Sequence, residues 1–418
     1  MRAPIFAVLV ACAHPAAPLP ADSPAQTPAR PADAVRRYTI WLGGSRIGTA
    51  TEAETWSRDG VKLRRVEAMR FLRGAQVVEL ATSIDVDASV ALVPRRVRWT
   101  EIGGDVRTAE ATHDEHGWHG GATMPAAAVP AELLPLLVRR DGHFQGPVFL
   151  PARDFIAGTG RIEPIASHRL VARLALDATV AEATVAVATI DLADDGMPAR
   201  VVDGEGVIEL RATDETAREP FVPVDLIAAT AIPIAGQRGS RTSRLVLEGN
   251  LALPALPGQR AQPATTGLAV ELSPRLPGDL PPGEPGPDRT RQIAALVATV
   301  RGRITPTLAT SPATSRDPSA IAGDCTTFAL AFAALAASQG IPTRLVTGLR
   351  VDGARLVRHR WAVSWTGTRW IAVDAAFGAA PAGGDLIGLA VHDADEAGLV
   401  SGEAALSAVR SASWAGPD

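Results

Sequence analysis

The stretch Gly323-Asp324-Cys325-Thr326-Thr327 decides the interpretation of this sequence, and it runs directly into the alanine-rich segment Phe328 to Ser338. The alanine-rich segment predicts a helix that ends at Gly340 and Pro342. Cys325 is therefore expected at or near the N-terminus of this helix, where unpaired backbone N–H groups and the helix dipole favour a thiolate. The alternative is a small buried hydrophobic side chain, which is a common environment for a free cysteine.

Farther along the chain, a predicted hairpin places a histidine near an aspartate. Its strands are Leu356 to Trp365 and Trp370 to Asp374, joined by a short turn. If the tryptophans that flank the turn pair, His359 lies one diagonal step from Asp374 on the same face, within reach of a carboxylate–imidazole contact. A register slip of one residue would place Asp374 on the opposite face. Each residue also has a structural alternative, because His359 fits a strand interior and Asp374 fits the end of a strand.

Five short motifs in this region resemble the transglutaminase-like superfamily. In order, they are Gly323-Asp324-Cys325, Gly340-Ile341-Pro342-Thr343-Arg344, Val346-Thr347-Gly348-Leu349, His359-Arg360-Trp361 and Trp370-Ile371-Ala372-Val373-Asp374.

This resemblance covers Thr290 to Gly388 and implies a papain-like catalytic triad of Cys325, His359 and Asp374. It also implies a thiol-bearing helix packed on an antiparallel sheet that bears the other two residues. Two features depart from the family pattern. Thr327 stands where the family often has an acidic residue, and no tryptophan lies shortly before Cys325 to complete an oxyanion hole.

The three residues together predict an enzyme that transfers acyl groups from amides. His359 would take the thiol proton, Asp374 would fix the imidazole tautomer, and the backbone N–H of Cys325 would be the first oxyanion donor. Water would resolve the thioester in a hydrolase, and an amine would resolve it in a transamidase. The expected substrate is a protein or peptide amide, with cell-wall peptides among the candidates, and no cofactor or metal is expected. The alternatives are a cysteine peptidase and a catalytically silent domain that serves binding or assembly in the cell envelope.

The first residues predict export. Met1 and Arg2 precede a short apolar run, Ile5 to Ala11, and Cys12 follows it directly. This pattern resembles a bacterial lipoprotein signal in which Cys12 is lipidated. It predicts a periplasmic or outer-membrane-anchored lipoprotein that meets the membrane only through a lipid anchor at Cys12. The alternatives are an A-x-A cleavage site for ordinary secretion, Ala11-Cys12-Ala13, and a misplaced start codon.

The sequence texture predicts an α+β protein, in which an N-terminal antiparallel β-rich domain precedes a papain-like transglutaminase core. The expected segments are a signal peptide at 1–12, a proline-rich tether at 13–34, the β domain at 35–221, a connecting region rich in β-strand and proline at 222–289 and the transglutaminase-like domain at 290–418. Within the β domain we expect a helix over Ala131 to Arg140, kinked or shortened by Pro135, and a strand over Val201 to Leu210. Within the connecting region we expect strands over Arg244 to Glu248 and Leu268 to Leu272.

Composition and motif content exclude several classes of protein. A net charge of -4, the lack of a glycine-rich phosphate loop and the lack of a basic aromatic patch argue against a nucleic-acid partner. Two cysteines in 418 residues exclude a disulfide framework. His113, His116 and His119 suggest a metal site, but a hairpin that pairs His113 with Trp118 turns His119 to the other face, so the three do not converge. His392 is a rival base that we expect at the surface.

Overall fold

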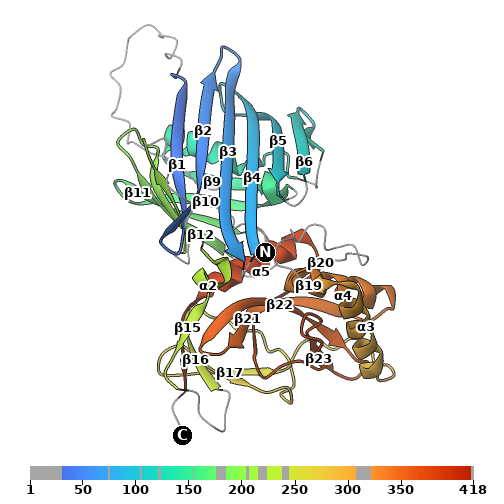
Figure 1. Ribbon diagram of the computed structural model, residues 1–418. Helices are drawn as coiled ribbons and strands as arrows, with labels where there is room; N and C mark the ends of the chain where they lie inside the picture. Colours follow the sequence, from blue (N-terminus) through green and yellow to red (C-terminus); the bar gives the residue numbers. More distant parts are fainter. Residues whose placement is uncertain are drawn as a thin grey trace.

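The chain folds into two bodies, each built on one large sheet, as the computed structural model shows (Figure 1). The expected signal peptide, 1–12, and most of the tether lie outside the described residues. Among the helices that are described, none is long and apolar enough to cross a membrane. The structure describes residues 31–73, 76–103, 106–120, 124–153, 155–175, 185–203, 207–214, 224–237, 244–306 and 322–415.

The N-terminal body is a 14-stranded sheet in which neighbouring strands are antiparallel, apart from the short parallel pair β8 and β9. The spatial order is β7-β6-β5-β4-β3-β2-β1-β14-β13-β12-β11-β10-β9-β8, so consecutive strands pair along most of the sheet. This confirms the expected N-terminal antiparallel β domain. The strands are β1 (Ala34–Leu42), β2 (Ser45–Trp56), β3 (Gly60–Arg73), β4 (Gln76–Ser89), β5 (Pro94–Ile102), β6 (Val106–Asp114), β7 (Gly117–His119), β8 (Val129–Pro130), β9 (Phe144–Leu150), β10 (Ile156–Ala166), β11 (Arg169–Ala175), β12 (Val185–Leu192), β13 (Pro198–Asp203) and β14 (Ile208–Ala212).

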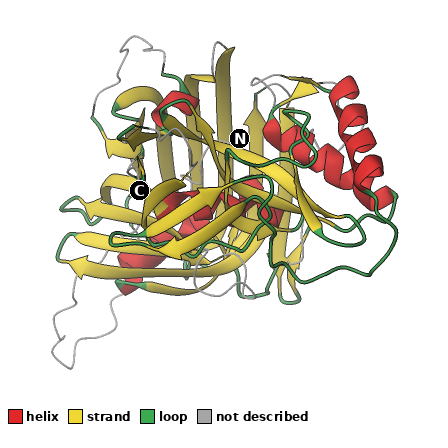
Figure 2. Cartoon of the chain, turned by 90° about the horizontal axis from the view of Figure 1, so that it is seen from below, coloured by secondary structure: helices red, strands yellow, loops and turns green. Residues whose placement is uncertain are grey.

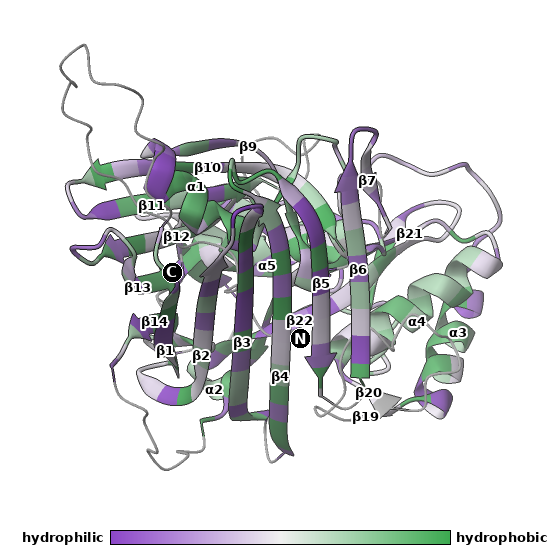
Figure 3. Ribbon diagram, turned by 90° about the horizontal axis from the view of Figure 1, so that it is seen from above, coloured by the Kyte–Doolittle hydropathy of each residue, from purple (hydrophilic) through white to green (hydrophobic). Residues whose placement is uncertain are grey.

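Alternating hydropathy explains why these segments form strands with one buried face. In β3, Val61 and Leu63 are buried, whereas Lys62 and Arg64 between them are exposed. Because successive strand side chains point to opposite faces, this alternation covers the core side with apolar groups and leaves the charges in water. Figure 3 shows the same alternation as bands along neighbouring strands.

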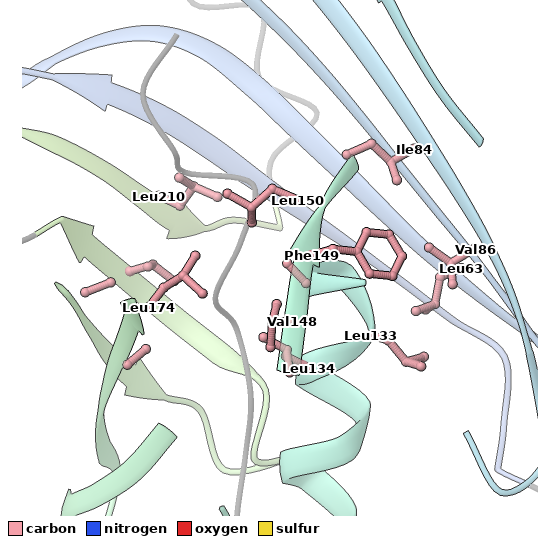
Figure 4. Close-up of a cluster of buried hydrophobic side chains, with 14 of the residues drawn as sticks. Leu63, Ile84, Val86, Leu133, Leu134, Val148, Phe149, Leu150, Leu174 and Leu210 are labelled. Atoms are coloured by element: carbon pink, nitrogen blue, oxygen red, sulfur yellow. The ribbon is translucent and has the colours of Figure 1, made fainter. Parts of the chain in front are cut away.

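A short helical segment fills the space inside the curved N-terminal sheet. It consists of η2 (Ala131–Leu133) and α1 (Leu134–Asp141), which together cover the helix expected over Ala131 to Arg140. Pro135 lies in the first turn of α1, where its missing N–H leaves no helical bond unmade. Figure 4 shows Leu133 and Leu134 of this segment among apolar side chains of the surrounding strands.

The strand expected over Val201 to Leu210 is wrong, because the segment is divided between β13 and β14, which pair with each other. The Asp203 carboxylate accepts hydrogen bonds from the backbone N–H groups of Val207 and Ile208, at 2.8 Å and 3.2 Å. An aspartate that binds the backbone in this way favours a chain reversal over a continuous strand.

The C-terminal body is a nine-stranded sheet with the order β17-β18-β16-β25-β15-β22-β21-β24, and β23 also pairs with β22. Within the region expected as a connection, 222–289, the described residues supply four strands of this sheet. Its strands are β15 (Ile232–Ala235), β16 (Arg244–Gly249), β17 (Gln259–Pro263), β18 (Leu268–Leu272), β21 (Thr343–Asp352), β22 (Arg355–Trp365), β23 (Trp370–Val373), β24 (Leu386–His392) and β25 (Val409–Trp414). The two strands expected within 222–289 correspond to β16 and β18.

Helices cover one face of this sheet. They include α3 (Thr290–Arg303) and α4 (Cys325–Ser338), which pack on each other and bury Leu345 and Ala362 of the sheet beneath them. Figure 2 shows these two helices at one side of the molecule. Two shorter helices, α2 (Leu226–Ala229) and α5 (Glu396–Ala405), lie nearer the N-terminal body (Figure 1). The remaining short elements are η3 (Pro151–Arg153), β19 (Thr305–Pro306), β20 (Ala322–Gly323) and η5 (Leu406–Ala408).

The proline-rich residues 273–287, here called the strap, lie against β22 and β23. Trp365 donates its ring N–H to the carbonyl of Glu284, and Trp370 donates its ring N–H to the carbonyl of Pro281, both at 2.8 Å. The prolines prevent the strap from forming a helix or a central strand. The two tryptophan ring N–H groups bond to backbone carbonyls that regular secondary structure would otherwise satisfy.

The two bodies are joined by buried contacts. At the end of β3, Arg73 of the N-terminal body bonds to Asp324, the residue before α4, at 2.5 Å. The side chain of Val400, on α5, is fully buried in the core of the N-terminal body. The N-terminal sheet is therefore packed directly on the body that carries Cys325.

Candidate active site

Cys325 is the first residue of α4, as the sequence predicts. The preceding residue, Asp324, caps the helix: its Oδ1 accepts the backbone N–H groups of Thr326 at 2.9 Å and Thr327 at 3.3 Å. Gly323 is required before this cap, because a Cβ there would lie 2.0 Å from the Oγ1 of Thr327. Thr327, the residue that departs from the family pattern, is thus a buried packing partner of that glycine.

The predicted register of the histidine hairpin is confirmed. Trp365 pairs with Trp370 and Ala362 with Val373, which brings His359 and Asp374 together across the two strands. The Nε2 of His359 donates to the Oδ2 of Asp374 at 2.7 Å, and both residues are buried.

Asp374 is held from behind by its own loop. Its Oδ1 accepts the backbone N–H of Phe377 at 3.2 Å, and its backbone exchanges two hydrogen bonds with Ala379. The loop therefore fixes the orientation of the carboxylate independently of its contact with the imidazole.

The thiol and the imidazole perturb each other as an ion pair would. Burial lowers the pKa of His359, but hydrogen bonds to Asp374 and to the Cys325 thiol outweigh it and raise that pKa to about 10. Burial likewise raises the pKa of Cys325, but the hydrogen bond to His359 and its charge bring the net value below the ordinary one. Since Nε2 faces Asp374, Nδ1 is the ring nitrogen left for the thiol. Both shifts favour thiolate with imidazolium.

Two aromatic rings flank His359. Trp361 stacks nearly parallel to the imidazole at 5.9 Å and is buried, and Phe377 meets it edge-on at 5.4 Å. Phe377 is 53% exposed, and the guanidinium of Arg350 lies 3.6 Å from its ring centroid. The imidazole is therefore packed between a core residue and a residue open to solvent.

The expectation that His392 lies at the surface is wrong. His392 ends β24, the last strand of the sheet, which pairs with β21, and its side chain is buried. Its Nδ1 donates to the carbonyl of Asp393, and its Nε2 accepts from the hydroxyl of Thr347, both at 2.9 Å. Burial and the nearby Arg360 cation lower its pKa to about 3, so it stays neutral, and it lies apart from the His359–Asp374 pair.

The N-terminal histidines occupy a hairpin with the predicted register, in which His113 pairs with Trp118. His113 bonds to the carbonyl of Ala126, and His119 bonds to Asp114, each at 2.9 Å. Within the described ranges, no group of three or more histidine, cysteine or acidic side chains is placed to hold a metal ion.

Sequence reasoning missed two arginines near the thiol. Arg360 lies inside the quoted motif His359-Arg360-Trp361; its guanidinium is buried and donates to the hydroxyls of Thr347 at 2.9 Å and Thr326 at 3.1 Å. The sequence offered one signal for Arg360, namely its position between His359 and Trp361 in a motif that the resemblance covers. Arg73 lies 251 positions before Asp324 in the chain, so no local pattern could reveal their pairing.

A helix-borne thiol beside an imidazole–carboxylate pair on an antiparallel sheet defines a class of cysteine acyl-transfer and protease folds. Residues 283–375 match the sequence model of the Transglutaminase-like superfamily, so the chain carries a domain of this superfamily. A comparison with curated proteins and one with solved structures each gave no match.

Proposed function

We propose that this protein is an exported thiol enzyme that acts on amide or peptide bonds through a thioester on Cys325. The observation that carries the proposal is the buried His359–Asp374 pair, joined at 2.7 Å, together with Cys325 at the start of α4, whose pKa this imidazole lowers. A cysteine with a purely structural role does not require a neighbouring imidazole whose orientation is fixed by a carboxylate, whereas a nucleophilic cysteine does.

The reaction follows from these positions. The Cys325 thiolate attacks the amide carbonyl carbon, and the tetrahedral oxyanion faces the start of α4, where the backbone N–H of Cys325 has no intrahelical partner. The C–N bond then breaks as the imidazolium of His359 gives its proton to the departing amine or ammonia, and a thioester remains. Water or an amine adds to the thioester and gives a proton to His359. Collapse of that adduct releases an acid or a new amide and restores the thiolate–imidazolium pair.

The expected export signal supports a location outside the cytoplasm. Residues 1–12 have the order of a lipoprotein signal, and a lipid on Cys12 would hold the protein in the periplasm or at the outer membrane. In that location the accessible amides belong to exported proteins and to cell-wall peptides, which are the substrates we propose.

The proposal is tested by alkylation of Cys325 with iodoacetamide as a function of pH. The full chain carries Cys12→Ser, so that Cys325 is the only thiol. We expect a labelling midpoint well below the free-thiol value of about 8.5, and a rise toward that value in His359→Ala. A midpoint near the free-thiol value in both proteins would overturn the proposal and favour a silent binding or assembly domain. In an amide-hydrolysis or amine-transfer screen, Cys325→Ala is expected to be inactive.

A further inference from the structure

We propose that Arg73, supplied by the N-terminal β domain, is a positioning residue for Cys325. It holds the Asp324 carboxylate in place as the helix cap and neutralises the negative charge that this carboxylate would otherwise present to the thiolate. The inference rests on the proposed function, since it concerns the reactivity of the same thiol.

The first support is the geometry of the Asp324 carboxylate. Its Oδ2 accepts Nη2 of Arg73 at 2.5 Å, while its Oδ1 accepts the backbone N–H groups of Thr326 and Thr327. One side chain thus joins the guanidinium to the first turn of the helix that begins with Cys325. Both charged partners are buried, with 4% and 5% of their surface exposed, so solvent screens the pair little.

The second support is the sign of the charges. Asp324 is adjacent to Cys325, and its negative charge raises the pKa of the thiol, against the effect of His359. Burial alone would raise the pKa of Asp324, but Arg73 contributes to holding it below its ordinary value, so the carboxylate remains an ionised cap. Asp324 can therefore cap the helix as a carboxylate, while Arg73 offsets the negative charge that would otherwise destabilise the neighbouring thiolate.

The third support is the origin of Arg73. It is the last residue of β3, and the neighbouring Leu72 is fixed to Val224 by a backbone hydrogen bond of 2.7 Å. The guanidinium thus comes from a long strand of the other body, whose end reaches the C-terminal body (Figure 1) and is held by Val224, a residue packed on the N-terminal core.

Other charges near the start of α4 are arranged around the same helix. Within the part of the chain that the structure describes, the charged groups that face it directly or through one intermediary include Asp324 at the cap, His359 of β22 with Asp374 behind it, Arg73 of β3, Arg360 of β22 through the Thr326 hydroxyl, and Glu403 of α5, 3.9 Å from Arg360. Among these, Arg73 is the cation bonded directly to the carboxylate next to the nucleophile.

The test uses the alkylation profile of the full chain with Cys12→Ser. Arg73→Met removes the cation and keeps the length of the side chain. We expect the labelling midpoint to rise by about one pH unit, so that labelling below the midpoint slows about tenfold. Adding Asp324→Asn should return the midpoint to or below the parent value, because asparagine caps a helix as well as aspartate and carries no charge.

A matched control separates this effect from general loosening of the two bodies. Arg153→Met removes another buried arginine that bonds across them, to Glu403 of α5. We expect this variant to keep the parent midpoint. Arg73→Lys, which retains the charge, should fall between the parent and Arg73→Met.

Two results would overturn the role of Arg73. One is an unchanged midpoint in Arg73→Met; the other is a raised midpoint that Asp324→Asn does not restore, which would show a purely structural contact. If Arg73→Met does not fold, Asp324→Asn alone decides: we expect a lower midpoint, and an unchanged or higher one refutes the inference. Failure of the proposed function is a separate result, since it appears as an unactivated thiol in the parent protein.

Discussion

Replacing Asp374 by asparagine tests the central feature of the site with little change of shape. The pKa of His359, raised from 6.5 to about 10, corresponds to about 5 kcal/mol in favour of the imidazolium. That free energy is shared between the Asp374 carboxylate and the Cys325 thiolate, and it is opposed by burial. A carboxylate in direct contact contributes about 1–3 pH units of such a shift.

We therefore expect Asp374→Asn to lower the titration midpoint of His359 by about 1–3 pH units. The measurement is an NMR titration of the histidine ring carbons, with the His359 signal assigned by its loss in His359→Gln. Asp352→Asn is the control, because Asp352 is exposed and pairs with Arg355 on the surface of the same body. An unchanged His359 midpoint in Asp374→Asn would refute the assignment of the carboxylate as the group that charges the imidazole.

The same charges set the expected pH dependence of turnover. As pH falls below the lowered pKa of Cys325, the thiolate gains a proton and the rate falls; as pH rises through about 10, His359 loses the proton that the leaving group needs. Asp374→Asn should narrow this range from the alkaline side and lower kcat/KM by about 10²–10⁴. A pH profile with an unmoved alkaline limit would contradict this reasoning.

Three further predictions concern stability. Arg360→Met should lower the free energy of unfolding by about 1–3 kcal/mol in urea, because it removes a buried hydrogen-bond donor from the hydroxyls of Thr326 and Thr347; an unchanged urea midpoint would disprove that role. Trp365→Phe should cost about 1–3 kcal/mol by freeing the Glu284 carbonyl, and a loss as small as that of an exposed substitution would contradict it. The pKa of His392 is about 3 in the folded protein and 6.5 in the unfolded chain, so between these values only the unfolded chain binds the proton. The free energy of unfolding therefore falls as the pH drops through this range, by about 2–3 kcal/mol at pH 4.5. His392→Gln should flatten this part of the profile, and an unaltered slope would show that another group is responsible.

The local geometry of the candidate site could be predicted from the sequence because it depends on short sequence patterns. A capped helix start places Cys325, and period-two strands with a tight turn place His359 opposite Asp374. Each pattern spans few residues, so propensity and pairing rules suffice.

What the sequence did not predict depends on contacts between distant segments. The burial of His392 follows from α5, which packs on β24 so closely that a Cβ at Gly402 would lie 2.7 Å from Nε2 of His392, and such packing is not encoded in local hydropathy. The strands in 222–289 looked like a connecting region because their partners, such as β25, lie more than 150 residues away. Arg73 illustrates this best. From the sequence it looks like an exposed residue at the end of a strand, and its partner Asp324 is brought to it only when the two bodies pack.

The place of β25 in the C-terminal sheet has a consequence for how the protein folds. β25 lies between β16 and β15, and α5, just before it, contributes Val400 to the core of the other body. Neither the sheet that carries His359 nor the core of the N-terminal body is complete until residues 396–414 have been synthesised and have folded back. Such long-range pairing is slow relative to local structure. We therefore expect the geometry around Cys325 to be completed late in folding, after β25 has paired with β15 and β16.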